Sequence, residues 1–177
     1  MDETPITIRE YDPTWAETFE AERERLETFL ESRTSRIEHV GSTAVEGLGA
    51  KPVIDVLAVV TDLPGAWGDL DNLATFYGYE LSHIPGDWLF LQRTDDSGQL
   101  YNLHLIQESD DQWRDDLLFR EYLRANPDVR DEYEAVKREA AESHPSDITA
   151  YNAAKDEFCR SVLSRAKSDE SVTVPDE

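Results

Sequence analysis

Residues 37–60 read IEHVGSTAVEGLGAKPVIDVLAVV, and this stretch decides the fold. A strand-like run ends at the pair Gly41-Ser42, and a glycine-bearing turn follows it. The chain then enters an apolar segment, residues 53–60, in which Asp55 is the only charged residue. Because this segment is apolar on both alternating faces except at Asp55, it predicts a central strand that is covered on both sides.

The residues around this turn suggest an anion site. Backbone N–H groups beside a small hydroxyl can hold a phosphate, and a carboxylate that faces them can hold a metal ion. Gly41, Ser42 and Asp55 supply these groups. The alternative for the Gly-Ser pair is a plain strand-to-helix turn in which Ser42 caps the helix.

Asp55 needs a charged or hydrogen-bonding partner if its strand is buried. An unpaired buried carboxylate is costly, so it needs a cation or strong hydrogen-bond donors. A metal ion or a ligand would serve, and so would an internal pair with Lys51 or an arginine. Lys51 precedes Pro52, which favours an extended backbone and brings the amine near the start of the Asp55 strand. Its partner is therefore either a phosphate or Asp55 itself.

The stretch resembles the signature of the nucleotidyltransferase superfamily, in which Gly-Ser and a turn lead to two Asp residues one residue apart. More narrowly, it resembles the GrpB-like branch, in which His-x-Gly-Ser-Thr leads to Lys-Pro-x-x-Asp. Further segments fit that branch in the same order, over about residues 10–165: the His-bearing strand 102–105, the segment 118–127, and the Tyr-x-x-x-Lys pairs Tyr133/Lys137 and Tyr151/Lys155. Taken from the residues alone, these two pairs are more typical of helix packing.

The resemblance implies an α+β (mixed α/β) fold: a nucleotidyltransferase-like mixed sheet packed by helices, with a helical C-terminal third. It implies Mg²⁺ or Mn²⁺ at Asp55 as the catalytic carboxylate, and a nucleotide or phosphorylated small molecule bound by Gly41, Ser42, Thr43 and Lys51. The sequence departs from the signature at Val53, where the first Asp is expected. Two-metal transfer needs carboxylates that bridge both ions. Glu38 and Asp87 are candidate substitutes.

Basic residues and histidines give further candidates. Arg93, Arg120 and Arg124 stand out because bases are scarce, and the last two lie one helical turn apart, as an anion clamp requires. Ion pairing with neighbouring acids is the alternative. His39 and His104 are either core histidines or, with Asp55, a His/His/Asp metal site. If the phosphate site is real, Lys51, Arg93 and one of the other two arginines should converge on it.

The composition limits the class of protein. The 177 residues include 39 acids and 17 bases, giving a net charge of −22, and the acids are scattered along the whole chain. Such a surface repels nucleic acid at low salt, and its self-repulsion fades at high salt, which is typical of a salt-rich cytoplasm such as that of a haloarchaeon. We found no apolar run long enough to span a membrane and no signal peptide, so a cytoplasmic location is expected.

Three functions remain open. The first is nucleotide or phosphate binding, with Mg²⁺-dependent nucleotidyl transfer to an unknown acceptor. The second is a non-catalytic module, like the accessory domain that is fused to dephospho-CoA kinase in some bacteria; Val53 favours this reading. The third is a His/Asp metal hydrolase. The substrate, the acceptor and the oligomeric state are not determined by the sequence.

Local patterns predict one domain over residues 1–166 and an acidic flexible tail over 167–177. The predicted strands cover residues 4–10, 36–40, 53–60, 79–83, 88–93 and 100–106. Helices are predicted over 13–32 and 64–77, and three more begin near 113, 127 and 147.

Overall fold

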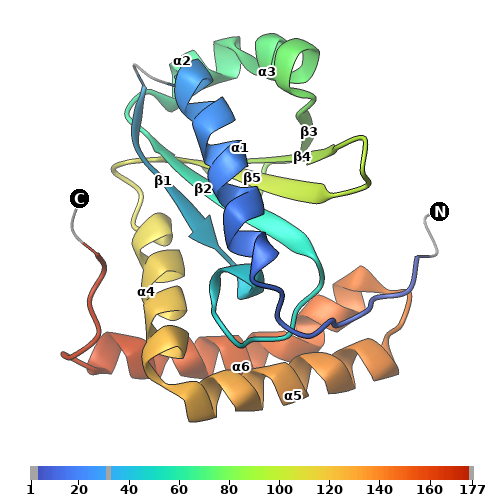
Figure 1. Cartoon of the computed structure of the whole chain (residues 1–177). Coiled ribbons are helices and arrows are strands. Elements are labelled where there is room, and N and C mark those ends of the chain that lie inside the picture. The colour runs from blue at the N-terminus through green and yellow to red at the C-terminus, as the bar shows by residue number, and fades with distance from the viewer. Residues whose placement is uncertain (1–3, 31–32, 176–177) are drawn as a thin grey trace.

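The computed structural model describes residues 4–30 and 33–175, which fold around a five-stranded mixed sheet (Figure 1). The strands are β1 (Thr34–Val40), β2 (Val53–Val60), β3 (Glu80–His83), β4 (Leu89–Thr94) and β5 (Leu100–Gln107). Their order across the sheet is β1-β2-β5-β4-β3. β2 and β5 run parallel, and the other neighbours pair antiparallel. β2 is therefore the internal strand that its apolar sequence predicts.

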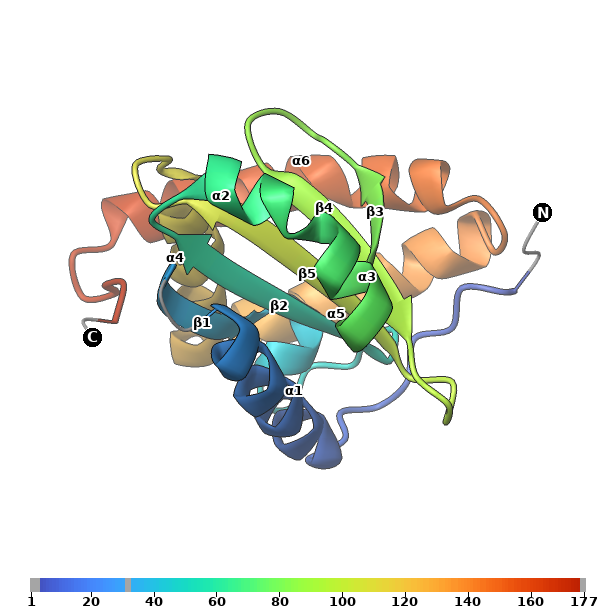
Figure 2. The ribbon, with the colours of Figure 1, turned by 90° about the horizontal axis from the view of Figure 1, so that it is seen from above.

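Helices cover both faces of this sheet. They are α1 (Thr14–Leu30), α2 (Leu63–Gly68), α3 (Leu70–Tyr77), α4 (Gln112–Ala125), α5 (Pro127–Ser143) and α6 (Ile148–Ser168), and a short 3₁₀ turn, η1, spans Ser42–Ala44. Seen from above, α1, α2 and α3 lie in front of the sheet, with α4, α5 and α6 behind it (Figure 2). This arrangement confirms the predicted α+β class with a helical C-terminal third.

The helix starts follow from local chemistry. The Asp12 carboxylate accepts a hydrogen bond from the Thr14 backbone N–H at 2.9 Å, and the Asp147 carboxylate accepts one from the Ala150 N–H at 3.0 Å. Proline is tolerated in the first turn because its missing N–H would have no partner there, and α5 begins at Pro127. Capping side chains of this kind stabilise a helix by about 1 kcal/mol each.

The apolar core forms on both sides of β2. Alternate residues of β2 pack with α1, α2 and α3 on one face, including the fully buried Ile54 and Val56. On the other face, Leu57 and Val59 pack with Trp113 and neighbouring residues of α4. Because side chains alternate along a strand, Asp55 shares the second face with Leu57. That face carries the candidate site.

Two predicted elements differ from the structure. The predicted strand over residues 4–10 is an irregular segment that makes an isolated bridge, Arg9 with Ala50, because it runs beside a loop and finds no strand to pair with. The predicted helix over residues 64–77 is divided into α2 and α3 at Asp69. Gly68 favours the division because glycine weakens a helix, and the Asp69 backbone N–H bonds to the Ala66 carbonyl oxygen at 3.1 Å in a tighter turn there.

The predicted flexible tail also needs correction. α6 continues to Ser168, and Val172 and Val174 pack against two of the apolar clusters. Arg36 donates a hydrogen bond from Nη2 to the Pro175 carbonyl oxygen at 2.8 Å. Both valines are partly shielded from water in this arrangement, so the segment up to residue 175 makes specific contacts with the domain. The last two residues lie outside the described part of the chain.

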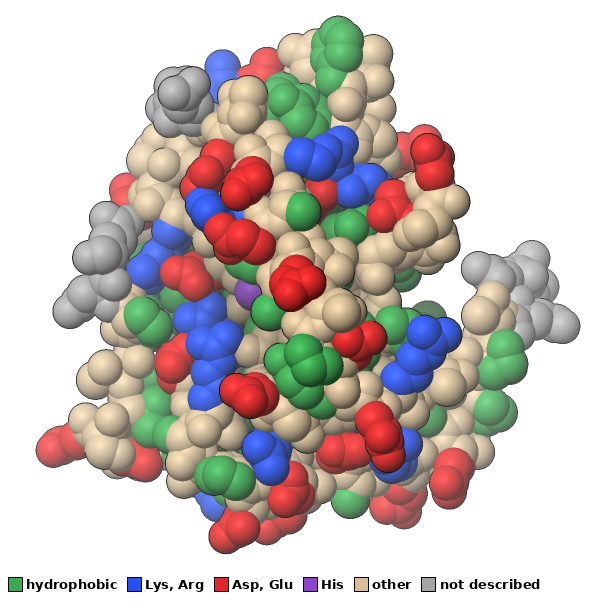
Figure 3. Space-filling view, in the orientation of Figure 1, with side chains coloured by type: hydrophobic (Ala, Val, Ile, Leu, Met, Phe, Trp, Pro, Cys, Tyr) green, Lys and Arg blue, Asp and Glu red, His purple; other side chains and the backbone are tan. Residues whose placement is uncertain are grey.

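The surface agrees with the charge count. Acidic side chains are spread over the face shown in Figure 3, with basic ones between them. Across the residues that the structure describes, no helix has both the length and the apolar character that a membrane span requires.

Candidate functional site

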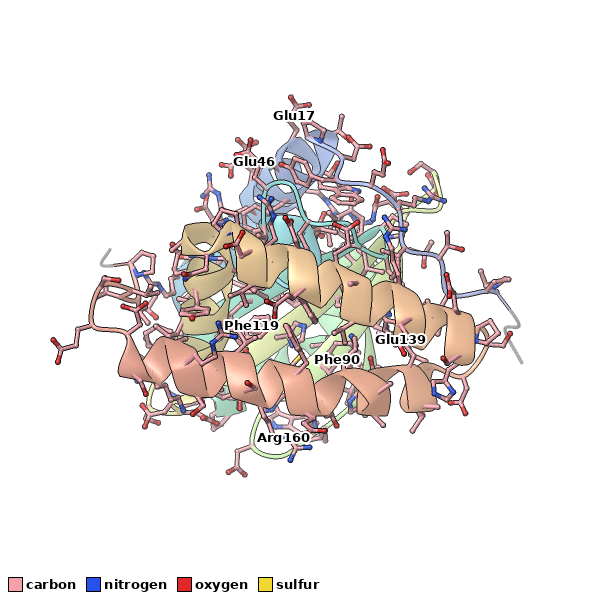
Figure 4. All side chains as sticks on the ribbon, turned by 90° about the horizontal axis from the view of Figure 1, so that it is seen from below. Glu17, Glu46, Phe90, Phe119, Glu139 and Arg160 are labelled. Carbon is pink, nitrogen blue, oxygen red and sulfur yellow. The ribbon has the colours of Figure 1, made fainter. Side chains whose placement is uncertain are left out.

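A cavity of about 660 Å³ opens on the Asp55 face of the sheet, between the sheet on one side and helices α5 and α6 on the other. Its floor comes from β2, β5, β4 and β3, and its walls from η1, α5 and α6. Figure 4 looks onto this face, with α5 and α6 in front of the sheet and Phe90 visible between them. The cavity brings together five residues that the sequence analysis singled out: Gly41, Ser42, Thr43, Lys51 and Asp55.

Gly41 and Asp55 touch at the centre of the cavity. The φ angle of Gly41 is 73°, a value that side-chain-bearing residues rarely adopt. A Cβ atom at this position would lie 2.5 Å from Asp55 Oδ2, which is closer than real contacts allow. The turn therefore needs glycine for two independent reasons. Its backbone abuts the carboxylate directly.

Two side chains of β5 contact the Asp55 carboxylate at Oδ1. Asn102 donates a hydrogen bond from Nδ2 to Asp55 Oδ1 at 2.9 Å, and His104 Nε2 lies 3.4 Å from the same oxygen. Gln92 on β4 in turn donates from Nε2 to Asn102 Oδ1 at 2.9 Å. This chain of amides fixes the carboxylate with Oδ1 engaged and Oδ2 beside Gly41.

Lys51 and Lys155 both line the cavity and both contact one aromatic ring. Their Nζ atoms lie 5.1 Å and 4.3 Å from the centre of the Tyr151 ring. Burial lowers the pKa of both lysines, and the charge of Lys51 lowers that of Lys155 further. Among the described residues, no ion pair joins Lys51 to Asp55, whose charge acts on Lys51 from a distance.

Lys137 is the third lysine of the cavity and is 1% exposed. Its ammonium donates to the Gly49 carbonyl oxygen and lies 4.8 Å from the centre of the Tyr133 ring. Burial, followed by the charge of Lys155, lowers the pKa of Lys137 to about 7. The chain has four lysines in all, so three of them line one cavity.

The three predicted arginines lie outside the cavity, so the convergence that was made the condition of the predicted phosphate site is not found. The predicted site built on these arginines is therefore wrong, and any anion in this cavity must be held by other residues. Arg93 points to the opposite face of the sheet, where it binds the buried carboxylate of Glu22. Arg120 donates from Nη1 to Glu38 at 2.8 Å and to the His39 carbonyl oxygen at 2.9 Å. Arg124 donates to the Ala44 carbonyl oxygen at 2.7 Å and so secures the turn that follows Gly41. Each guanidinium group therefore already donates hydrogen bonds to acceptors outside the cavity, and its planar fork of N–H groups suits such contacts.

His39 does not join Asp55 and His104. It pairs with Val56 across β1 and β2, so it faces α1, where its ring stacks on Phe19 at 4.7 Å. Burial lowers the pKa of His39 to about 4, and its Nε2 lies 2.9 Å from Thr43 Oγ1. The described residues contain no group of three His, Cys, Asp or Glu side chains placed to hold a metal ion. The predicted three-ligand centre is therefore wrong.

Thr43 is engaged in the turn. Its hydroxyl donates to the Val53 carbonyl oxygen at 3.0 Å and also contacts His39. Neither candidate substitute for the missing carboxylate lines the cavity: Glu38 is bound by Arg120, and Asp87 is exposed in the loop before β4. Val53 itself lies in the floor, where the superfamily signature carries its first Asp.

Four cavity residues are not predicted as site residues by the sequence analysis. The spacing of Lys137 and Lys155 favours helix packing, although the scarcity of lysine in the chain is a signal that these two residues could share a site. Asn102 and Gln92 were not singled out as site residues. Their signal was a polar side chain at alternate positions of two otherwise apolar strands.

Comparison with solved structures places this architecture in the nucleotidyltransferase-like class. A cytoplasmic RNA terminal U-transferase matches with a TM-score of 0.51 and 16% identity, over 73% of this chain and 41% of that chain. At this identity the match shows the fold alone. The crystal structure of the conserved protein GrpB from Enterococcus faecalis matches with a TM-score of 0.81 and 30% identity, over 92% of this chain and 98% of that one.

The chain belongs to the GrpB protein family, whose model matches residues 5–165. It is 36% identical to the UPF0157 protein BH1888 of Halalkalibacterium halodurans, covering 92% of this chain and 83% of that protein. It is 32% identical to the glutamate-rich protein GrpB of Alkalihalophilus pseudofirmus, covering 89% and 94%. A dephospho-CoA kinase of Mycolicibacterium paratuberculosis is 31% identical over 92% of this chain and 46% of the kinase. These relatives are bacterial, so they give no support to an archaeal source.

Proposed function

We propose that this protein binds a phosphorylated small molecule, such as a nucleotide, with the phosphates held by Lys51, Lys137 and Lys155 beside the Gly41-Ser42 turn. One observation carries the proposal: three of the four lysines, in a chain of net charge −22, line a single cavity. Like charges repel and burial penalises each ammonium, so such a cluster destabilises the protein unless an anion binds to it. A polyphosphate would supply that anion.

The first test removes Lys155, whose ammonium contacts the Tyr151 ring and makes no ion pair with any described residue. We expect Lys155→Met to weaken the binding of sodium tripolyphosphate more than tenfold in titration calorimetry, because a charge-assisted hydrogen bond contributes about 1.5–3 kcal/mol. Lys167→Met is the matched control, since the fourth lysine pairs with Asp115 at 3.0 Å outside the cavity. Equal weakening in both variants, or no binding by the wild type, would contradict the phosphate site.

The acidic groups fit one bound cation better than two. Among the described residues, Asp55 is the single carboxylate that lines the cavity, and its Oδ1 already accepts hydrogen bonds. An oxygen-seeking ion such as Mg²⁺ or Mn²⁺ could use Oδ2 and complete its ligands with phosphate oxygens. When bound, the ion would neutralise phosphate charge. Nucleotidyl transfer to an unknown acceptor is thus a second candidate, favoured by the retained Asp55 and weakened by Val53.

Asp55→Asn separates a cation site from a structural role. We expect the variant to stay folded and to lose the gain in nucleotide affinity that Mg²⁺ or Mn²⁺ gives the wild type, because the amide keeps the shape without the charge. Titrations with and without the divalent ion measure the gain, and urea melts measure stability. A loss of about 3–5 kcal/mol of unfolding free energy, with no metal effect in the wild type, would show that Asp55 is part of a buried internal pair.

A non-catalytic binding or folding-accessory module remains the alternative to transfer. The hydrophobic Val53 in the cavity floor favours it, because two-metal chemistry has no second bridging carboxylate there. The similarity to part of a dephospho-CoA kinase is compatible with such a role. The predicted His/Asp hydrolase loses support, since His39 lies on the other face of the sheet.

The acidic surface is proposed as an adaptation to salt. With a net charge of −22, self-repulsion opposes the compact state, and salt screens it over about 3 Å at 1 M. We expect the urea midpoint to rise clearly between 0.1 M and 2 M KCl. A midpoint that stays level or falls over this range would rule the adaptation out.

A further inference from the structure

The sheet between Asp55 and the β3 edge carries two rows of side chains that phosphate binding does not use. Strand register builds the first row from Asn102 and Gln92, which continue outward from Asp55 as a chain of hydrogen-bonded amides. It builds the second from His104, Phe90 and His83 on β5, β4 and β3. Side chains two residues apart on a strand share a face, so both rows lie in the cavity floor.

The second row is a continuous set of rings. Phe90 lies 5.1 Å from His104 and 4.8 Å from His83, measured between ring centres. Trp88 stacks on His104 at 5.2 Å with an interplanar angle of 20°, which holds that imidazole in place. Across the cavity, α6 presents Ile148, which is 48% exposed although it is apolar. The cavity therefore offers aromatic rings from its floor and an exposed apolar side chain from its α6 wall.

We propose that the part of the cavity lined by Phe90 and His83 binds a purine or pyrimidine ring, while the lysines bind the phosphates of the same ligand. Phe90 and the exposed His83 each supply an aromatic ring, tilted by 50° to one another, on which a base can stack, and such stacking tolerates any base. The neighbouring amides offer hydrogen bonds to its edge: within the described residues, Gln92 uses one N–H toward Asn102 and keeps its carbonyl oxygen. A purely aliphatic ligand would desolvate the remaining Gln92 carbonyl oxygen without giving it a hydrogen-bond donor. The position relative to phosphate rests on the proposed function.

The proposed ring site and the proposed phosphate site can be tested with separate ligands. Adenosine, guanosine, cytidine and uridine are titrated singly into the full chain, with and without saturating sodium tripolyphosphate. At least one nucleoside should bind in both conditions. Phe90→Leu, which keeps an apolar side chain without the ring, should weaken that binding about tenfold and change the tripolyphosphate affinity less than twofold. Phe76→Leu is the control, because Phe76 is 72% exposed on α3, away from the cavity.

The outcomes distinguish the two proposals. Failure of all four nucleosides to bind, or equal effects of the Phe90 and Phe76 variants, overturns the ring site. Failure of tripolyphosphate alone overturns the phosphate site, while nucleoside binding that depends on Phe90 would still support the ring site. If urea melts show that Phe90→Leu is unfolded, His83→Leu replaces it, since His83 is exposed. That variant must then show the same selective loss of nucleoside binding.

Discussion

Replacing Arg93 by Met should lower the free energy of unfolding by about 3–5 kcal/mol, because it leaves a buried charge without its main partner. Glu22 on α1 is 2% exposed. Its carboxylate accepts hydrogen bonds from Arg93 at 2.6 and 3.0 Å and from Tyr79 Oη at 2.6 Å. Burial raises the pKa of Glu22, but these bonds outweigh it and the net shift is downward. Without Arg93, the buried carboxylate keeps the Tyr79 hydroxyl and the partly exposed Arg25, whose Nη1 lies 2.8 Å from Glu22 Oε2, but it loses the guanidinium that binds both of its oxygens.

Urea unfolding of the wild type and the Arg93 variant measures this loss. Arg114→Met is the control, since Arg114 and Asp111 form an exposed pair whose loss should change stability by less than about 1 kcal/mol. Adding Glu22→Gln to the Arg93 variant should restore part of the stability, because the neutral amide is cheaper to bury. Similar losses from the Arg93 and Arg114 variants would show that the buried pair is not a major determinant of stability.

Stability of the ligand-free protein should rise between pH 7 and 9.5, by on the order of 3 kcal/mol, through Lys137. The folded-state pKa of Lys137 is about 7, against 10.5 for a free side chain. Between these values the unfolded chain binds more protons, so raising the pH favours the folded state. Below pH 7 the folded protein must hold a buried ammonium beside Lys155 and Arg138, and only Glu134 offsets it on the same helix.

Urea melts at several pH values give the slope, and Lys137→Met should reduce it, leaving the contribution of Lys51 and Lys155, whose pKa values burial also lowers. Stopping at pH 9.5 avoids the ionisation of tyrosines such as Tyr79 and Tyr133, whose raised pKa values act in the opposite direction. Tripolyphosphate affinity should change the other way and fall as the pH rises, because the anion favours charged lysines. A slope that the Lys137 substitution leaves unchanged would assign the effect to other groups.

The turn and its carboxylate could be predicted because their signal is local. Gly41 and Asp55 are joined by a short turn and a single strand, and the apolar character of β2 already indicated an internal position. The face on which each strand residue lies was harder to predict, because it depends on register. His39 pairs with Val56 and Asp55 with Val40, so one position along the pairing separates the two predicted metal ligands.

The roles of the basic residues depended on tertiary partners that the sequence does not display. The scarcity of bases draws attention to Arg93, yet its partner Glu22 lies 71 residues away in the sequence. Both residues lie on the α1 face of the sheet, opposite the cavity. Lys137 and Lys155 belong to different helices, and only the packing of α5 and α6 beneath the sheet brings both to one cavity. Spacing along a helix could not reveal that convergence.

The parallel pairing of β2 with β5 has a consequence for how the protein is made. A hairpin cannot join parallel strands, and residues 61–99, with α2, α3, β3 and β4, separate these two. A chain that emerges from the ribosome in order therefore presents Gly41 and Asp55 early, and the lysines of α5 and α6 last. A ligand that needs all of them can hold only a chain that has been synthesised through α6. Binding would then shift the nascent population toward fully assembled molecules.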